Sequence, residues 1–236
     1  MNRDIEDYFN RLQDFDFFTR FTIEQMQEII SGSIIHQYPK GQVLFYHGDP
    51  RSYYYFLFRG LVSLGKTDPS GEYSYKDYIK ENTFFPYRMF LNQEKAYPYT
   101  AITETEIDVL LIPKDLFEST VVDNKHQILY MYQKISEILK FQELRLQLTV
   151  TSSAYDRVQL ALAIWIYDLG KEMFVEEKKV IVIPYSLTIN ELGSSAGTTR
   201  ETASRVINDL DNEGKIKFTR KQVLIYDIDF FMDFLL

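Results

Sequence analysis

Three charged side chains, Arg200, Glu201 and Arg205, have the types and spacing needed to read DNA bases. A guanidinium can donate two hydrogen bonds to O6 and N7 of guanine, and a carboxylate can accept one from N4 of cytosine. With 3.6 residues per turn, these residues share one arc of a helix with Ser204. The pattern predicts a helix face that reads G·C pairs.

The same side chains also fit an ordinary solvated helix surface. Glu201 and Arg205 are four residues apart, a spacing at which opposite charges stabilise a helix. Glu201 also stands three residues after Thr198, as in a capping box, which would direct its carboxylate to the backbone. The neighbouring elements must decide between the two interpretations.

The flanking sequence predicts two short helices joined by a tight turn. Thr-x-x-Glu capping boxes at 188–191 and 198–201 begin the two helices. The small residues at 193–197 are predicted to end the first helix, and Gly214 to end the second. The apolar residues of the second helix fall opposite its charged arc: Ala203, Val206, Ile207 and Leu210.

A predicted β-hairpin follows the second helix and favours DNA binding. Ile216 and Phe218 alternate on one side of a turn at 219–222, and Val223 and Ile225 on the other. A winged helix-turn-helix requires such a hairpin. Four cations on or near it are predicted to contact phosphates: Lys215, Lys217, Arg220 and Lys221.

The segment GTTRETASRVINDLDNEGKI resembles the DNA-binding signature of the Crp/Fnr superfamily of bacterial transcription regulators, the relatives of the cyclic-AMP receptor protein. Its Arg-Glu-Thr-x-x-Arg pattern is met by Arg200, Glu201, Thr202 and Arg205. Between Ile34 and Pro113, short alternating runs with turns about every ten residues favour an antiparallel sandwich or barrel. There, YPKGQVLFYHGDPRSYYYFLFRGLVSL resembles the first half of the family's cyclic-nucleotide-type jelly roll.

The ligand loop departs from this family. Cyclic-nucleotide binders of the fold carry Gly-Glu and, about ten residues later, Arg-Ser or Arg-Thr, which bind the ribose and the phosphate. The corresponding residues here are Pro86, Tyr87, Tyr97 and Pro98. Proline also lacks the backbone N–H that could serve an anion. Cyclic AMP is therefore not expected to bind.

Two alternatives remain open for this region. Phe84 and four candidate pocket residues, Phe85, Tyr87, Tyr97 and Tyr99, either form an aromatic ligand site or fill the pocket, and the second is favoured. Arg88 either compensates for the lost phosphate contact or is an ordinary surface cation, which is again favoured.

Nothing in the sequence indicates a cofactor or a catalytic site. The chain has no cysteine, which removes disulfides and thiolate iron–sulfur ligands. His36, His47 and His126 are dispersed, so neither haem nor a metal ion is expected. There is no P-loop and no dinucleotide-binding glycine motif, and an enzyme is not predicted.

The negative charge of the chain limits how it can bind DNA. The net charge is −8, and residues 151–236 contain ten Lys and Arg against thirteen Asp and Glu. Binding must therefore depend on a local cationic patch.

No apolar stretch approaches 20 residues and no signal peptide is recognisable, so a soluble, cytoplasmic protein without membrane contact is expected.

A long helix is predicted from Asp123 to about Val150, where apolar residues recur at three, four and seven and neither Pro nor Gly occurs. Its length, about 40 Å at 1.5 Å per residue, exceeds what one small domain needs. Such a stripe is most often intramolecular core, but the resemblance implies a dimerisation helix. The residues assigned to the dimer interface are Ile128, Met131, Tyr132, Ile135, Ile138, Leu139, Gln142 and Leu146.

The remaining sequence predicts two helices within 2–31, a helix at 156–169, a charged turn at 171–177, a strand at 180–183, and an apolar C-terminal stretch that packs on the body of the protein.

The sequence and the resemblance together predict an α+β protein with three parts. Residues 1–122 are expected to form a sensor domain, a double-stranded β-helix (jelly roll). Residues 123–150 form the dimerisation helix, and 151–236 the winged helix-turn-helix domain. Arg200, Glu201, Ser204 and Arg205 are assigned to bases, and Thr198, Thr199, Lys217, Arg220 and Lys221 to phosphates.

The expected function is that of a homodimeric regulator, an activator by family analogy, that binds a palindromic TGTGA-like site in double-stranded DNA and recruits RNA polymerase. The alternative is a ligand-sensing module that regulates a partner protein without binding DNA. A gel shift distinguishes the two.

Overall fold

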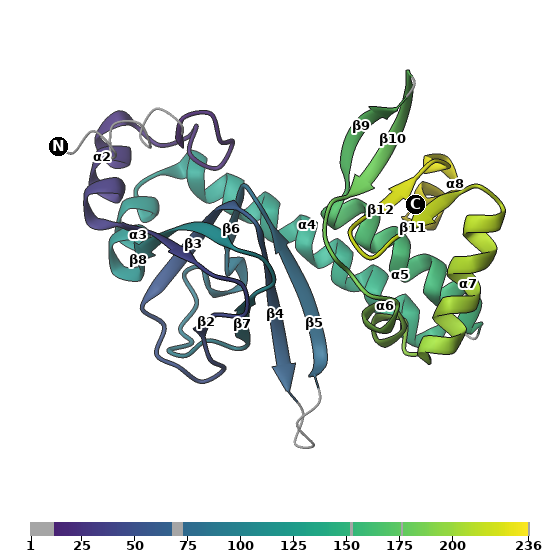
Figure 1. Ribbon diagram of the computed structural model, residues 1–236. Coiled ribbons are helices and arrows are strands. Elements are labelled where there is room, and N and C mark those ends of the chain that lie inside the picture. The colour runs from purple at the N-terminus through teal and green to yellow at the C-terminus, as the bar shows by residue number, and fades with distance from the viewer. Residues whose placement is uncertain (1–11, 68–72, 152, 176, 236) are drawn as a thin grey trace. The chain divides into compact units, whose positions relative to one another are not determined.

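The computed structural model describes residues 12–67, 73–151, 153–175 and 177–235 (Figure 1). The chain divides into two compact units, Met1–Glu137 and Ile138–Leu236, and the long helix α4 (Lys125–Val150) passes from the first into the second. Of the two helices predicted within residues 2–31, the first lies mainly outside the described residues. The second is α2 (Ile23–Gly32), which a capping box between Thr22 and Gln25 begins.

The first unit is an antiparallel β-sandwich, as predicted. One four-stranded sheet has the order β1 (Ile34–Tyr38), β8 (Ile107–Pro113), β3 (Tyr53–Arg59), β6 (Thr83–Phe85). The other has the order β2 (Val43–Phe45), β7 (Thr100–Thr103), β4 (Leu61–Thr67), β5 (Tyr73–Lys80). The 3-10 helix η1 (Tyr87–Met89) follows β6, and α3 (Lys114–Val122) connects the sandwich to α4.

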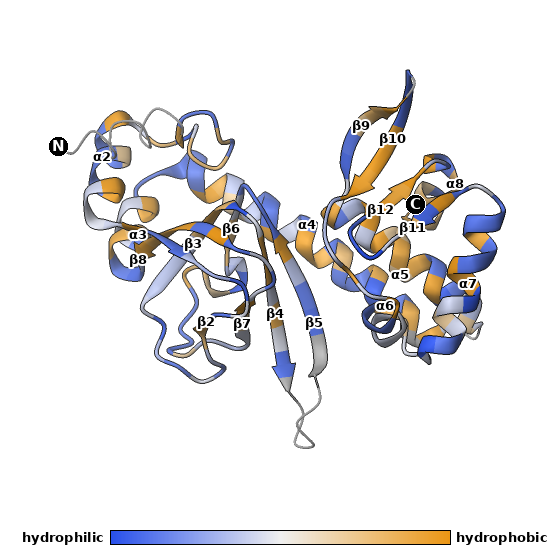
Figure 2. Cartoon of the chain, viewed as in Figure 1, coloured by the Kyte–Doolittle hydropathy of each residue, from blue (hydrophilic) through white to orange (hydrophobic). Residues whose placement is uncertain are grey.

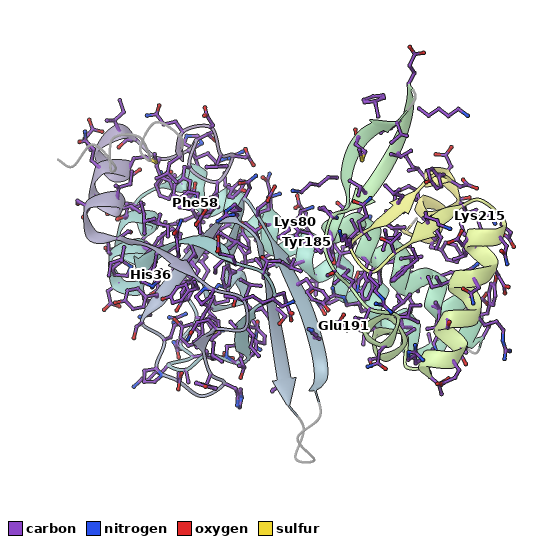
Figure 3. The ribbon with its side chains drawn as sticks, viewed as in Figure 1. His36, Phe58, Lys80, Tyr185, Glu191 and Lys215 are labelled. Atoms are coloured by element: carbon purple, nitrogen blue, oxygen red, sulfur yellow. The ribbon has the colours of Figure 1, made fainter. Side chains whose placement is uncertain are left out.

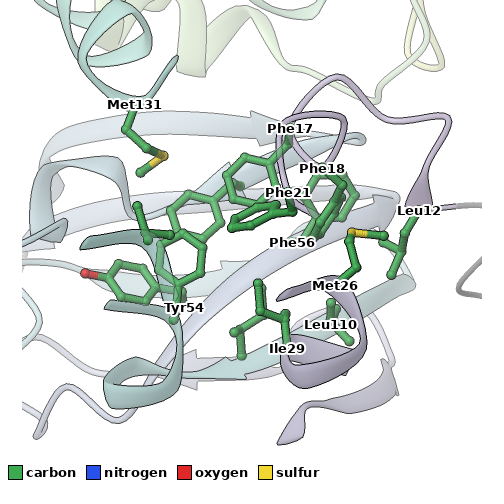
Figure 4. Close-up of a cluster of buried hydrophobic side chains, with 14 of the residues drawn as sticks. Leu12, Phe17, Phe18, Phe21, Met26, Ile29, Tyr54, Phe56, Leu110 and Met131 are labelled. Atoms are coloured by element: carbon green, nitrogen blue, oxygen red, sulfur yellow. The ribbon is translucent and has the colours of Figure 1, made fainter. Parts of the chain in front are cut away.

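The continuous aromatic run of β3 explains why this unit is so rich in Phe and Tyr. Alternate side chains of a strand point to opposite faces of the sheet. Tyr54, Phe56 and Phe58 enter a core that also contains Met26, Ile29 and Ile30 of α2, whereas Tyr55 and Leu57 enter a second core. Figure 4 shows Tyr54 and Phe56 beside Phe17, Phe18 and other members of the first core. Because both faces of the strand are buried, an alternating pattern of polar residues is absent.

The second unit is built around α5 (Ala154–Leu169), of whose 16 residues ten are buried and which Figure 2 colours mainly as hydrophobic. Ser153 caps its N-terminus by accepting a hydrogen bond from the N–H of Asp156. The other helices are α6 (Ile189–Ser195), α7 (Arg200–Asn212), α8 (Ile228–Met232) and the 3-10 helix η2 (Asp233–Leu235). A four-stranded sheet has the order β11 (Ile216–Phe218), β12 (Val223–Ile225), β10 (Lys178–Ile183), β9 (Lys171–Val175). The apolar C-terminal stretch packs on α5 through α8 and η2, as predicted.

The charged turn predicted at 171–177 is wrong, because most of it forms strand β9. This strand pairs antiparallel with β10, with Val175 opposite Lys178 and Lys171 opposite Val182. β9 lies at the edge of the sheet, and its last four side chains are exposed on both faces. No alternation of apolar and polar residues therefore marks it in the sequence.

Helix α4 buries side chains in the first unit along its first half and in the second unit along its second half, and it leaves other apolar side chains exposed. In its first half Tyr130 and Met131 are buried in the core of the first unit. In its second half Leu144 and Leu148 are buried, and Arg145 forms an ion pair of 3.1 Å with Asp168 on α5. The apolar side chains of α4 that remain exposed are Leu129, Tyr132, Ile135, Ile138, Leu139, Leu146 and Val150.

Two residues assigned to the dimer interface must be corrected. Met131 is 0% exposed within its own unit, and Ile128 packs against the same core. At 3.6 residues per turn, the arc that contains them overlaps the arc of Ile135, and the core of the first unit covers this arc near Ile128 and Met131. Tyr132, Ile135, Ile138, Leu139 and Leu146 are exposed, and Gln142 is half-buried.

No helix in the described part of the chain is long and apolar enough to cross a membrane. The described residues also contain no group of three or more His, Asp and Glu side chains arranged to hold a metal ion. His36 lies on β1 (labelled in Figure 3), His47 between β2 and β3, and His126 on α4.

Candidate nucleic-acid interface

Helix α7 has one packed face and one charged, exposed face. Ala203, Val206, Ile207 and Leu210 are buried, and α7 contacts α5, α6 and β11. Arg200, Glu201 and Arg205 are exposed, and Ser204 is half-buried. Figure 2 shows hydrophilic residues along the outer side of α7. The predicted division of this helix into a packing face and a presenting face is observed.

The start of α7 differs from the prediction by one residue. The N-cap is Thr199, whose hydroxyl accepts a hydrogen bond of 3.2 Å from the N–H of Thr202. The backbone N–H of Thr198 instead donates to the carbonyl oxygen of Gly193 at 2.9 Å, which places Thr198 in the turn. The capping box between Thr198 and Glu201 is therefore not formed, and capping does not occupy the Glu201 carboxylate.

The charges on the exposed face do not neutralise one another. Among the described residues, no ion pair joins Glu201 to Arg205, and none involves Arg200. The pair assumed by the solvated-surface interpretation is thus absent. Two guanidiniums and one carboxylate remain available to an external partner.

The turn before α7 depends on close packing of small residues. A capping box joins Thr188 and Glu191 at the start of α6, as predicted; Figure 3 labels Glu191. Gly193 lies inside α6 rather than at its end, and a Cβ there would be 3.2 Å from the carbonyl oxygens of Thr198 and Thr199. Gly197, at φ +57°, then reverses the chain. A larger residue at 193 would push the start of α7 away.

The β11–β12 hairpin presents two cations at its tip. The hydroxyl of Thr219 donates to the carbonyl oxygen of Gln222 at 2.7 Å, which closes the turn. Ser186 holds the same turn by donating to the carbonyl oxygen of Arg220. Arg220 and Lys221 are exposed, and neither takes part in an ion pair among the described residues.

The other two cations near the wing are partly neutralised by carboxylates at the end of α7. Lys217 lies 3.0 Å from Asp211, and Lys215 lies 2.7 Å from Glu213. The ammonium group of Lys215, labelled in Figure 3, also lies 3.8 Å from the ring centroid of Phe230. The charge of Lys217 is therefore partly offset, whereas no ion pair among the described residues offsets the charge of Arg220 or Lys221.

Comparison with protein families agrees with both units. Residues 35–124 match the family "Cyclic nucleotide-binding domain", and residues 161–233 match "Crp-like helix-turn-helix domain". Together these matches span more than half of the chain. The chain belongs to the Crp/Fnr family. It is thus a member of a family of transcription regulators, with a helix-turn-helix of the DNA-binding type.

Relatives of this Crp/Fnr chain match it over most of its length. It is 28% identical over 193 residues to the HTH-type transcriptional regulator ArcR of Staphylococcus haemolyticus, covering 81% of this chain and 82% of that one. It is 22% identical over 209 residues to the global nitrogen regulator of Synechococcus elongatus, covering 87% and 92%. The structure of FixK2 from Bradyrhizobium japonicum has a TM-score of 0.69 at 17% identity, covering 86% and 96%, which shows the shared fold.

Of the five candidate ligand-pocket residues of this Crp/Fnr chain, Tyr87 lies in a different core from Phe85, Tyr97 and Tyr99. Phe85 and Tyr97 are buried in the core between the two sheets, and Tyr99 packs against that core. Tyr87 is buried in the other core, where burial raises its pKa well above the ordinary value. Arg88 is exposed and forms an ion pair of 2.8 Å with Glu94. The structure therefore gives Arg88 a surface role.

Tyr97 is held by tight aromatic packing and a hydrogen bond to the backbone. Its ring stacks on Phe45 with a centroid separation of 3.8 Å, and its hydroxyl donates to the carbonyl oxygen of Tyr53 at 2.7 Å. Burial raises the pKa of Tyr97.

One residue that holds the loop after β6 was not identified from the sequence. The guanidinium of Arg51 is buried, lies 3.0 Å from Glu118 on α3, and donates to the carbonyl oxygens of Met89 and Asn92. An internal cation therefore fixes this loop to α3. No sequence pattern joins Arg51 to a carboxylate 67 residues away.

The cap of α7 can be tested with two adjacent threonines. Thr199→Ala should lower the free energy of unfolding of the isolated protein by about 1 kcal/mol, because the N–H of Thr202 loses its partner. Thr198→Ala, the matched control, should change it by less than about 0.5 kcal/mol. Chemical denaturation without DNA measures both. A larger loss for Thr198→Ala would show that Thr198 is the cap, and equal losses would contradict the assignment of the cap to Thr199.

Proposed function

We propose that this chain is a cytoplasmic, homodimeric transcription regulator that binds a palindromic TGTGA-like site, activates transcription by recruiting RNA polymerase, and does not respond to cyclic AMP. The observation that carries DNA reading is the exposed, unneutralised face of Arg200, Glu201 and Arg205 on a helix packed by its opposite side. Arginine pairs bidentately with guanine and glutamate accepts from cytosine N4, which favours two G·C pairs in each half-site.

The charge distribution supports contact by a local patch rather than by the whole surface. The chain carries a net charge of −8, so long-range attraction to phosphates is weak. Arg220 and Lys221 at the wing tip, together with the threonines that begin α7, supply the phosphate contacts. We therefore expect weak non-specific affinity and strong dependence on salt.

The exposed apolar side chains of α4 support assembly through this helix. Tyr132 is 69%, Leu139 58% and Leu146 65% exposed. Helices with apolar residues at this spacing pair through a seam of such residues. A two-fold dimer places two copies of α7 for two half-sites about one helical turn of DNA apart.

Selection of bound sequences from random double-stranded DNA tests the proposed function. Purified full-length protein should enrich an inverted repeat with G·C pairs in each half. Enrichment of no sequence, with and without added cell extract, would contradict DNA reading and favour regulation of a partner protein. A gel shift with the enriched and a scrambled duplex then gives the ratio of affinities.

Cyclic AMP at millimolar concentration should leave both the melting temperature and the DNA affinity unchanged. Pro86, Tyr87, Tyr97 and Pro98 offer no counterpart of the carboxylate and guanidinium of the family's ligand site, and the two tyrosines are buried in separate cores. A ligand at 100 times its dissociation constant adds about 2.7 kcal/mol to the stability of the folded state. Differential scanning fluorimetry measures this effect, and a clear rise in melting temperature would contradict the proposal.

A further inference from the structure

A single arginine joins the end of α4 to the turn that precedes α7. Arg157 lies in the first turn of α5, within the second unit. Its Nε donates to the carbonyl oxygen of Ala196 at 2.9 Å, and one terminal nitrogen donates to that of Gly197 at 3.3 Å. The other terminal nitrogen donates to the carbonyl oxygen of Thr151 at 3.0 Å. One planar group therefore binds two segments that are about 45 residues apart.

These three carbonyl groups lie at or directly after the C-termini of helices. Ala196 is the C-cap of α6, and Gly197 completes the turn into α7. Thr151 directly follows the last residue of α4. Carbonyl groups at helix ends lack partners within the helix, so an external donor is needed to satisfy them. The guanidinium has five donors in a fixed plane, which suits several acceptors at once, whereas an ammonium is a single compact charge.

We propose that Arg157 is a positioning residue for DNA recognition. It ties the turn at Ala196 and Gly197 to the end of α4, and α7 begins three residues beyond Gly197. Because Arg200 and Glu201 occupy the first turn of α7, a shift of the turn moves both of them relative to the bases. Arg157 acts through this backbone and does not itself contact DNA. The inference rests on the proposed DNA-binding function.

Two substitutions separate a positioning role from a role of charge alone. Arg157→Lys keeps the positive charge but not the planar set of donors, and Arg157→Ala removes both. For a positioning residue, both variants should bind the cognate duplex about tenfold more weakly per half-site. Binding to scrambled DNA and the salt slope should stay at the wild-type values. Wild-type binding by Arg157→Lys, with a salt slope lowered by about one in Arg157→Ala, would overturn the proposal in favour of a phosphate contact.

Arg145→Lys is the matched control. Arg145 is also a partly buried arginine in the second unit, and its ion pair of 3.1 Å joins α4 to Asp168 on α5. This variant should keep the wild-type ratio of cognate to scrambled affinity. A loss of that ratio equal to the loss in Arg157→Lys would overturn the specific role of Arg157.

Hydrogen exchange of the free protein provides a second measurement that needs no DNA. Amides of residues 193–202 should exchange faster in both Arg157 variants and at the wild-type rate in Arg145→Lys, while circular dichroism shows that all variants are folded. Unchanged exchange in the Arg157 variants would overturn the positioning role. If wild-type protein prefers no DNA sequence, the proposed function fails and the positioning role fails with it. A loss of preference confined to the Arg157 variants supports the positioning role alone.

Discussion

Leu139→Asp should convert the proposed dimer into monomers and abolish specific DNA binding at the same time. Leu139 is 58% exposed on α4 and lies on the apolar arc that also contains Ile135 and Leu146. In a two-fold interface the substitution buries two carboxylates without partners. Each uncompensated buried charge costs about 3–5 kcal/mol, so the dissociation constant of the dimer should rise at least about 10⁴-fold.

Sedimentation velocity and a gel shift with the cognate duplex measure the two losses in the same samples. Ile135→Asp should behave in the same way, since Ile135 lies on the same arc one turn before Leu139. Lys140→Asp is the control: position 140 is also exposed, but it lies about 100° away on the helix. If Leu139→Asp and Ile135→Asp sediment as unchanged dimers, the apolar stripe of α4 is not the interface between protomers.

The sequence predicts which helix carries an apolar stripe but not where along that helix the core of each unit ends. The 3.6-residue period places Met131 and Ile135 on overlapping arcs, and only the tertiary packing separates them. Met131 meets the aromatic core of the first unit, whereas Ile135 lies beyond it and is exposed. A periodic pattern shows that apolar side chains share one face of a helix, but it does not show whether the same unit or another protomer covers that face.

The charged face of α7 was predictable because helix, cap and turn chemistry are local. The error of one residue at its start has a physical cause. Thr198 and Thr199 are both good N-caps, and Glu201 favours the first of them in sequence. Thr199 is the N-cap in the structure, because the N–H of Thr198 is already bonded to the carbonyl oxygen of Gly193. This bond depends on the path of α6, which the residues around Thr198 do not specify.

Long-range contacts were the least predictable part of the structure. The pairing of Arg51 with Glu118 and the hydrogen bonds from Arg157 to the carbonyl oxygens of Ala196 and Gly197 join residues distant in sequence. The division of Phe85 and Tyr87 between two cores likewise depends on distant packing partners. The edge strand β9 became a strand through its pairing with β10. In each case a local pattern is compatible with several partners, and the fold selects one.

Glu201→Ala and Arg205→Ala should each weaken binding to the proposed palindrome by about 1–3 kcal/mol per half-site, because each removes a proposed contact to a base edge. Binding of scrambled DNA should barely change for Glu201→Ala, since removal of a negative charge cannot weaken attraction to phosphates. The ratio of cognate to scrambled affinity should therefore fall steeply. Gel shifts with both duplexes, at several salt concentrations, measure this ratio and its salt dependence.

Lys221→Ala should show the opposite behaviour. The exposed ammonium at the wing tip carries no sequence information, so its loss should weaken cognate and scrambled DNA alike and lower the salt slope by about one per half-site. Lys217→Ala is a useful comparison, because the ion pair of 3.0 Å with Asp211 already offsets the charge of Lys217. Its effect on the salt slope should be smaller than that of Lys221→Ala.

The comparison between Glu201→Ala and Lys221→Ala distinguishes base reading from phosphate contact, because both variants shorten an exposed side chain in the same small unit. Neither side chain forms an ion pair among the described residues, so neither variant leaves a buried charge behind. Differences between them must then come from what each side chain meets on DNA. If both variants gave the same cognate-to-scrambled ratio, α7 would not read bases. Its charged face would then be a solvated helix surface that contacts DNA, if at all, only through phosphates.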